Sequence, residues 1–227
     1  MDDLKAIQES LIIILILSII IYKIFISNPN ENKSLNKKIE DINKELSYIL
    51  HKSVIMETDE ENFIFSVIGK RMNKSIKGLN KLYQATIDGG DPRNFHQKCD
   101  NIKNTLVLIK SEGKRRFGGL TPIPWKSKGG FIEDKKKQTF VFSLDNKKIY
   151  NLKNIRWAVY HHKNYGPHFG GNDIIIAGNP IEEYYLRSIP DDYDYNGDKH
   201  PLSESDISYN DGYIKALEYE VFEVLFD

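Results

Sequence analysis

Most of the chain beyond Asn80 consists of short β-prone runs separated by turn signals. Glycine- or asparagine-containing turns, such as Lys128-Gly129-Gly130 and Asp145-Asn146, interrupt these runs repeatedly. Short strands with few helices between them predict a mainly β fold with flanking helices, built as a two-sheet antiparallel β-sandwich. The runs are TLVLIK (105–110), TFVFSL (139–144), RWAVYHH (156–162), DIIIAG (173–178) and YEVFEVLF (219–226).

Two helices are expected beside these strands. Thr58 and Glu61 have the spacing of a capping box, and residues 59–72 carry apolar side chains at helical spacing. The later segment NFHQKCD predicts a short helix with Asp91 or Asn94 near its N-cap.

Residues 1–30 contain a long apolar run. Between Leu11 and Ile26 the only charged residue is Lys23, and a helix over this stretch would be roughly 24 Å long, against ~30 Å of bilayer hydrocarbon. Snorkelling of Lys23 and local thinning of the bilayer can close that gap. A core helix is the alternative, but an apolar surface on all sides suits lipid better. We therefore expect a single-pass transmembrane anchor over residues 11–26.

Charge and cysteine content limit which cellular compartment and which classes of partner are expected. One lysine precedes the apolar run and several follow it, so the positive-inside rule places residues 53–227 in the cytosol, with the organelle undetermined. Cys99 is the only cysteine, which suits a reducing compartment. Basic and acidic side chains both number 32, so nucleic acid is not an expected partner.

Residues 31–52 predict an amphipathic stalk helix. Apolar side chains recur there at spacings of four and three, which makes a short coiled-coil-like heptad seam. Homodimerisation through residues 35–49 and a single stalk helix resting on the domain both fit a seam of this length. The seam residues are Leu35, Ile39, Ile42, Leu46 and Ile49. The remaining residues, 53–227, are expected to form one domain.

Several motifs of this last region, among them Asp88-Gly89, Gly118-Gly119 and Trp125, occur together and in the same order in one known family. Residues 53–226 closely resemble the TLDc domain of oxidation-resistance proteins. Two features depart from the family pattern: Asn172 stands where histidine is usual, and residues 179–213 keep little of the usual sequence. The family-signature positions are Asp88, Gly89, Phe95, His96, Cys99, Asp100, Phe117, Gly118, Gly119, Trp125, Tyr165, Gly166, Pro167, Phe169, Gly170, Gly171 and Asp173.

This resemblance implies a sandwich of two antiparallel sheets, in agreement with the strand pattern. It also implies a non-catalytic protein-binding role linked to oxidative-stress resistance. In several members of the family it implies contact with the vacuolar proton-pumping ATPase. No cofactor and no metal are expected, and the signature positions are expected to be structural.

The stretch YHHKNYGPHFGGNDI (160–174) is the part of the chain most like a chemical site. His161 and His162 are adjacent, so in a strand they point to opposite faces of the sheet. One of them could bind a metal together with His168 and Asp173, but the spacing matches no standard zinc pattern. A phosphate loop is less favoured, because a strand follows the glycines instead of a helix.

We interpret this stretch as structural: its glycines and proline give the backbone a particular shape. Residues 165–167 are expected to make a rigid turn, and Gly170 and Gly171 to allow positive φ or close backbone approach. Asp173 is expected to accept hydrogen bonds from backbone N–H groups. Earlier in the chain, Gly118-Gly119 predicts either a β-bulge or a tight contact between sheets.

The alternative class of function is an enzyme that uses His96 and Cys99, or a metal held by His161 or His162 with His168. His96 and Cys99 lie three residues apart on the expected short helix, hence on one face. Cysteine is more often a small buried apolar residue, and no third catalytic partner is evident. Redox sensing by Cys99 would need an exposed thiol with a lowered pKa.

The segment DYDYNGD imitates the first half of a calcium loop, starting at Asp192. Its position 12 is Ser203, where a bidentate glutamate is needed, so a solvated acidic loop is favoured over weak calcium binding. Arg115-Arg116 and residues 135–137 are likewise expected in solvated turns.

Overall fold

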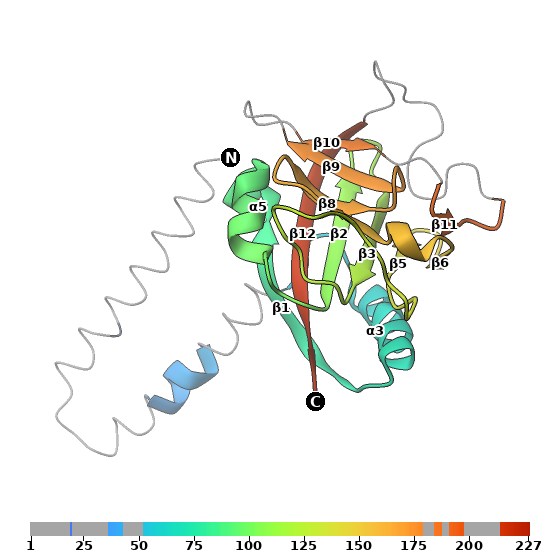
Figure 1. Cartoon of the computed structure of the whole chain (residues 1–227). Helices are drawn as coiled ribbons and strands as arrows, with labels where there is room; N and C mark the ends of the chain where they lie inside the picture. Colours follow the sequence, from blue (N-terminus) through green and yellow to red (C-terminus); the bar gives the residue numbers. More distant parts are fainter. Residues whose placement is uncertain (1–18, 20–35, 43–51, 179–183, 188–190, 198–213) are drawn as a thin grey trace. The chain divides into compact units, whose positions relative to one another are not determined.

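The described structure falls into two compact units. A computed structural model describes residues 19, 36–42, 52–178, 184–187, 191–197 and 214–227. One unit is Met1–Lys52 and the other is Ser53–Asp227. The second unit contains the helices and strands named below (Figure 1).

The second unit combines a few short helices with many strands. The helices are α3 (Thr58–Met72), α4 (Ala85–Asp88), α5 (Pro92–Cys99) and the 3-10 helix η1 (Ile155–Trp157). The strands are β1 (Ile76–Gln84), β2 (Thr105–Ser111), β3 (Arg116–Thr121), β4 (Gly130–Ile132), β5 (Phe140–Ser143), β6 (Lys148–Leu152), β7 (Val159–His161), β8 (Tyr165–Phe169), β9 (Ile174–Gly178), β10 (Tyr184–Arg187), β11 (Tyr193–Asp194) and β12 (Ile214–Phe226).

The described strands form one antiparallel hydrogen-bonded ladder. Its order is β11-β6-β5-β3-β2-β12-β10-β9-β8-β7-β4, with β1 also paired to β12. The predicted mainly antiparallel β architecture with a few helices is confirmed. The two halves are joined through β12 and enclose one core between them, which is consistent with the predicted β-sandwich. This strand pairs with β2 on one edge and with β10 and then β1 on the other, so it runs the length of the fold (Figure 1).

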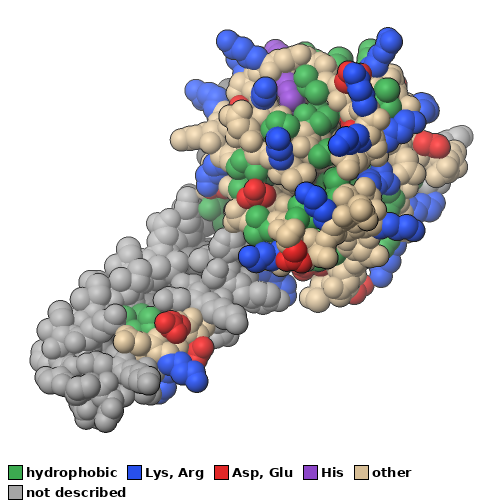
Figure 2. All heavy atoms as spheres, turned by 60° about the horizontal axis from the view of Figure 1, so that its bottom comes forward, with side chains coloured by type: hydrophobic (Ala, Val, Ile, Leu, Met, Phe, Trp, Pro, Cys, Tyr) green, Lys and Arg blue, Asp and Glu red, His purple; other side chains and the backbone are tan. Residues whose placement is uncertain are grey.

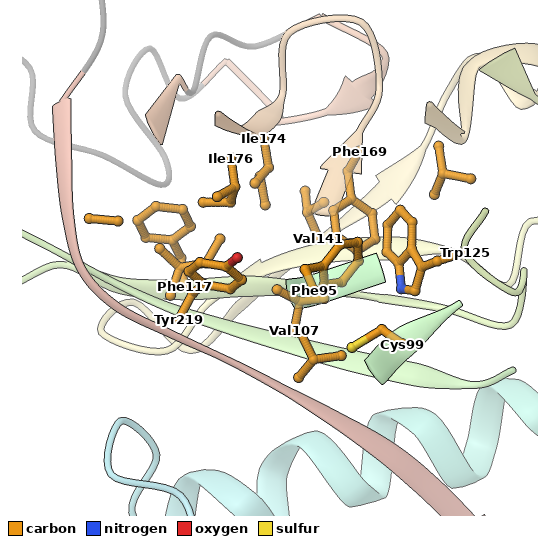
Figure 3. Packing of buried hydrophobic residues seen from close by; sticks show 14 of the residues in the cluster. Phe95, Cys99, Val107, Phe117, Trp125, Val141, Phe169, Ile174, Ile176 and Tyr219 are labelled. Carbon is orange, nitrogen blue, oxygen red and sulfur yellow. The ribbon is translucent and has the colours of Figure 1, made fainter. Parts of the chain in front are cut away.

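The larger apolar core lies between the two halves of the ladder. Val107 of β2, Phe117 of β3 and Val141 of β5 belong to the same cluster as Phe169 of β8 and Ile176 of β9. Figure 3 shows these side chains gathered together. All five are fully buried, so the burial of apolar area holds the halves against each other.

A second core covers the opposite face of β2, β3 and β5. Leu106 and Leu108 of β2 pack in a cluster with Ile64 and Ile68 of α3. Successive β2 side chains therefore enter alternate cores. This explains why TLVLIK is a continuous apolar run instead of an alternating one.

Helix α3 is capped one position earlier than the predicted Thr58 and Glu61 pair. Glu57 is the N-cap, and its backbone N–H donates to Glu60 Oε2 at 2.9 Å. The buried Glu60 carboxylate also accepts from Arg116 Nη1 and Nη2 at 2.9 and 2.8 Å. This ion pair joins α3 to β3 and selects Glu60 for the cap. The prediction that Arg116 lies in a solvated turn is therefore wrong.

Gly118 and Gly119 allow β3 to pack closely on both of its faces. A Cβ atom on Gly119 would lie 2.7 Å from Cζ of Phe169, in the larger core. A Cβ atom on Gly118 would lie 2.9 Å from Cζ of Phe142, in the core beneath α3. The ladder shows no register shift at either glycine. Of the two predicted alternatives, the tight contact is confirmed.

The first unit is described only at residue 19 and over 36–42, which are helical. Ile42 of the predicted seam is 40% exposed. Apart from residue 19, the expected anchor at 11–26 lies outside the described residues, as does most of the seam, so both stay predictions. Within the residues that the structure describes, no helix is long and apolar enough to cross a membrane.

Replacing Gly119 by alanine tests the contact between β3 and β8. We expect Gly119→Ala to lower the free energy of unfolding by about 1 to 3 kcal/mol, because the new methyl group overlaps the Phe169 ring. Phe169→Leu in the same chain should recover part of that loss. Urea unfolding of both single variants and the double variant measures the coupling. Strictly additive effects would show that the two residues do not press on each other.

Candidate functional site

Helix α5 anchors one end of the larger core. Asp91 is its N-cap, as one of the predicted alternatives had it, and Asp91 Oδ1 accepts the Arg93 N–H at 2.8 Å. The Phe95 ring stands edge-on to Tyr83 and to Trp125, with ring centroids 6.1 and 5.7 Å apart. The helix thus fastens β1 to the segment that follows β3.

His96 is committed to contacts other than Cys99. Its Nδ1 lies 2.7 Å from Asp100 Oδ1, and its Nε2 lies 3.1 and 3.0 Å from the carbonyl oxygens of His162 and Tyr165. Because a carbonyl oxygen can only accept, Nε2 carries a hydrogen. The His96 ring therefore ties α5 to the turn that precedes β8 and offers no free nitrogen to act as a base.

Cys99 is fully buried in the larger core. Burial raises the pKa of its thiol far above the usual range, and the charges of Asp100 and Asp88 raise it further. A buried thiol with a raised pKa is a poor nucleophile and a poor target for oxidants. The two conditions stated for redox sensing, exposure and a lowered pKa, are not met.

The remaining signature residues near α5 also hold backbone in place. Asp88 Oδ2 accepts the backbone N–H of Gln84 at 2.8 Å, and its Oδ1 pairs with Lys98 Nζ at 2.7 Å. Gly89 has a positive φ of 84°, and its carbonyl oxygen accepts the Tyr83 hydroxyl at 2.5 Å.

Asp100 and Trp125 connect the other side of α5. Asp100 Oδ2 accepts the hydroxyl of Ser127 at 2.8 Å. The indole Nε1 of Trp125 donates to Thr105 Oγ1 at 2.8 Å, which gives the buried ring a partner at the start of β2. These contacts bind α5, β2 and the approach to β4 into one frame.

His161 and His162 face opposite sides of the sheet, as their adjacency predicts. His161 is 3% exposed and lies against Trp125, with ring centroids 6.1 Å apart. Neither of its ring nitrogens has a hydrogen-bond partner among the described residues, and burial lowers its pKa to about 4. His162 is partly exposed, and its Nδ1 accepts the Asn164 N–H at 3.2 Å.

His168 is buried beneath the outer face of β8. Its Nε2 lies 3.3 Å from the Gly171 carbonyl oxygen, and burial lowers its pKa to about 4. In the part of the chain that the structure describes, no three His, Cys, Asp or Glu side chains come together to hold a metal ion. The possible set of His161 or His162 with His168 and Asp173 is therefore not assembled.

Asp173 and Asp192 fasten the glycine-rich loop to residues 191–193. Asp173 accepts the backbone N–H groups of Asp191, Asp192 and Tyr193 at 3.0, 2.9 and 3.3 Å. Asp192 Oδ2 in turn accepts the Gly171 N–H at 2.7 Å. The prediction that Asp173 accepts backbone N–H bonds is confirmed. Burial raises the pKa of Asp173 to about 6 and also raises that of Asp192.

The backbone of the glycine-rich stretch differs from the prediction at its start. Residues 165–167 belong to strand β8 and not to a rigid turn, which instead occupies residues 163–164. The pairing of β8 with β9 shifts register between Tyr165 and His168. That irregularity accommodates Pro167, which has no N–H to donate.

The two glycines of the loop serve different purposes. Gly170 adopts a positive φ of 63°. Gly171 has no positive φ but allows a close approach, since a Cβ atom there would lie 3.1 Å from Cε3 of Trp157. Both predicted roles are therefore present, one at each residue.

The prediction of a solvated acidic loop is wrong at its first residue, Asp192. Asp192 is buried, and its Oδ1 accepts the side-chain amide of Asn154 at 3.0 Å. Asp194 is exposed and accepts the Asn196 N–H at 3.0 Å. Asp198 and Ser203, the later positions of the calcium pattern, lie outside the described residues.

An aromatic strip covers the outer face of β4, β7 and β8. Phe131 and Trp157 are 39% and 40% exposed and stack with ring centroids 4.4 Å apart at an interplanar angle of 18°. The ring centroids of Tyr160 and Phe131 are 4.7 Å apart, and the Tyr160 ring also contacts the rings of His162 and Tyr165. We define the aromatic strip as Phe131, Trp157, Tyr160, His162 and Tyr165.

The strip is the candidate binding face of the domain. The outer face of the other half carries α3, whereas no described helix covers the strip. Exposed aromatic residues in contact with one another are typical of protein-binding surfaces. Sequence reasoning missed Phe131, Trp157 and Tyr160 as a site, since their proximity follows from the pairing of β4 with β7. The alternation of RWAVYHH is the one local signal, because it sends Tyr160 and His162 to the same face.

The pKa of Asp173 gives a pH test of the loop. The carboxyl pKa is raised on folding, so its stabilising contribution is complete below about pH 4 and is lost as pH rises through about 6. Asparagine at this position lacks the titration. We expect the stability advantage of the natural chain over Asp173→Asn to shrink by roughly 1 to 3 kcal/mol between about pH 4 and pH 7. Urea unfolding across that range measures it, and an advantage that grows with pH would contradict the argument.

Comparison with known families agrees with the geometry. A model of the TLDc domain matches residues 49–225. A search among curated proteins finds no match. The family model spans more than half of the chain, over the same region that forms the second compact unit. The chain therefore belongs to the TLDc domain family.

Proposed function

We propose that this chain is a non-catalytic protein-binding module held at a membrane by residues 11–26, with residues 53–227 in the cytosol. The observation that supports the binding role best is the aromatic strip. Phe131 and Trp157 each leave about two fifths of their surface exposed, although they stack on each other. Large aromatic side chains in such positions supply much of the affinity of protein interfaces.

The surroundings of the reactive groups support a non-catalytic role. The thiol of Cys99 lies in the core, and both ring nitrogens of His96 have partners in the frame around α5. Both carboxylate oxygens of Asp173 accept hydrogen bonds from backbone N–H groups. In each case the group stabilises the fold at the expense of its availability to a substrate.

The biological setting of the proposal comes from the family. TLDc resemblance implies a part in resistance to oxidative stress, and it makes the vacuolar proton-pumping ATPase a candidate partner. A membrane anchor would confine the module to one bilayer and raise its local concentration there. The short apolar run suits a thin membrane such as that of the endoplasmic reticulum.

Proximity labelling in cells tests both parts of this proposal. We expect deletion of residues 1–30 to remove the labelled membrane proteins. Phe131→Ser with Trp157→Ser, in the full chain, should remove the partner while leaving the membrane background unchanged. Ile87→Ser is the matched control, because Ile87 is 47% exposed and lies in α4, outside the strip. Loss of labelled ATPase subunits in the strip variant would support that partner.

An unchanged set of labelled proteins in the strip variant would contradict the binding role of this face. An unchanged membrane background after deletion of residues 1–30 would contradict the anchor.

A dimerising tether is the second candidate function, and Ile42 favours it. This seam residue is 40% exposed on the helix formed by residues 36–42, which leaves an apolar side chain for a second copy. We expect residues 31–227 to sediment as a dimer, and Ile42→Glu with Ile39→Glu to sediment as a monomer, because charges at seam positions oppose pairing. A monomer for the unmodified segment would exclude the tether.

A further inference from the structure

Exposed cations surround the aromatic strip. Lys128 lies two residues before β4, Arg156 adjoins Trp157 in η1, and Lys163 lies in the turn between β7 and β8. None of these three has an ion pair with a described residue. They are therefore free to meet carboxylates from outside the chain.

The carboxylates near the strip are fewer and are already engaged. Glu133, just after β4, pairs with Lys135 at 3.1 Å. Asp191, close to Gly171, accepts the side-chain amide of Asn172 at 3.0 Å. The margin of the strip thus has a local positive excess, although the whole chain is formally neutral. On the face seen in Figure 2, basic side chains are more frequent than acidic ones.

The strip is also held in one shape before any partner arrives. Trp157 packs over Gly171, whose N–H is fixed by Asp192. Tyr160 lies 5.0 Å from the buried ring of His168, which forms the floor of the strip. A pre-organised surface loses little conformational entropy when it binds. The exposed edges of Phe131 and Trp157 can therefore grip an apolar side chain efficiently.

We propose that the aromatic strip binds an acidic segment of a partner protein that carries a bulky apolar side chain. The apolar side chain packs on Phe131 and Trp157. The acidic residues flanking it pair with Lys128, Lys163 and Arg156 around the margin. This inference rests on the proposed binding function and names the chemistry of the partner.

Two other anionic partners fit the strip less well. Single-stranded nucleic acid stacks on exposed aromatics, but it also needs a basic groove that follows the phosphate backbone. Glu133 follows β4 directly and Asp191 lies close to Gly171 beside Trp157, so acidic side chains interrupt such a path near Phe131 and Trp157. An anionic membrane favours a broad single-sign surface, whereas the cations here flank a narrow apolar strip.

A peptide selection on the full chain in detergent micelles tests the proposal. A display library of random short peptides is selected against the protein, and enriched peptides are synthesised with a fluorophore for anisotropy titrations. We expect enriched peptides to carry net negative charge and at least one large apolar residue. Phe131→Ser with Trp157→Ser should weaken their binding by about 10-fold or more. Ile87→Ser should leave it unchanged.

Charge reversal tests the basic margin separately. Lys128→Glu with Lys163→Glu should weaken peptide binding by roughly 3- to 10-fold at low salt, and by less at high salt. Lys77→Glu with Lys103→Glu changes the net charge equally at exposed positions outside the strip and should have little effect. An oligouridine and vesicles containing phosphatidylserine serve as competing anionic ligands.

The outcomes separate this inference from the function on which it rests. Enriched peptides without an acidic bias, no enriched peptide, or binding insensitive to the strip variant would each overturn the proposed partner chemistry. Strip-dependent binding of oligouridine or vesicles without peptide binding would overturn it as well. If the strip variant still loses its partner in proximity labelling, the binding function stands and only the acidic segment is excluded.

Discussion

The double burial of strand β3 is the constraint on which the rest of the fold depends. One face of β3 meets the larger core and the other meets the core beneath α3, and Gly118 and Gly119 make both contacts possible at once. Helix α3 covers the outer face of this half. No described helix covers the outer face of the β4–β7–β8 half. That half closes its exposed face with large aromatic rings, which lower the apolar exposure by stacking on one another. The candidate binding face is thus a consequence of how the two halves are covered.

The buried polar groups follow from the cost of burying charge. An isolated charge in a core is expensive, so His161 and His168 have lowered pKa values and Asp173 a raised one. Asp173 offsets part of that cost by accepting three backbone N–H groups. Cys99 behaves as a small apolar residue. These residues resemble a chemical site in the sequence because of their composition, but their environments make them parts of the frame that positions the aromatic strip.

Sequence patterns predicted the elements whose side chains repeat regularly. The apolar runs of β2, β5 and β9 and the helical spacing of α3 were sufficient to place those elements. β8 was missed because Gly166 and Pro167 are typical of turns, and only its pairing with β9 makes it a strand. The α3 cap was misplaced because Glu60 is selected by Arg116, which is distant in sequence. The strip was not predictable, since Phe131 and Trp157 meet only when β4 pairs with β7.

The glycine-rich loop connects the family signature to the candidate face. Gly170 takes a left-handed conformation that brings the loop over Asp173, and a side chain there would collide with the Asp173 carboxylate. The fixed loop then places Gly171 beneath Trp157. A larger residue at Gly171 would displace the indole ring that stacks on Phe131. It would do so without itself contacting a partner. Substitutions at signature glycines can therefore alter binding through the geometry of the strip, which gives these backbone positions a functional consequence without making them a site.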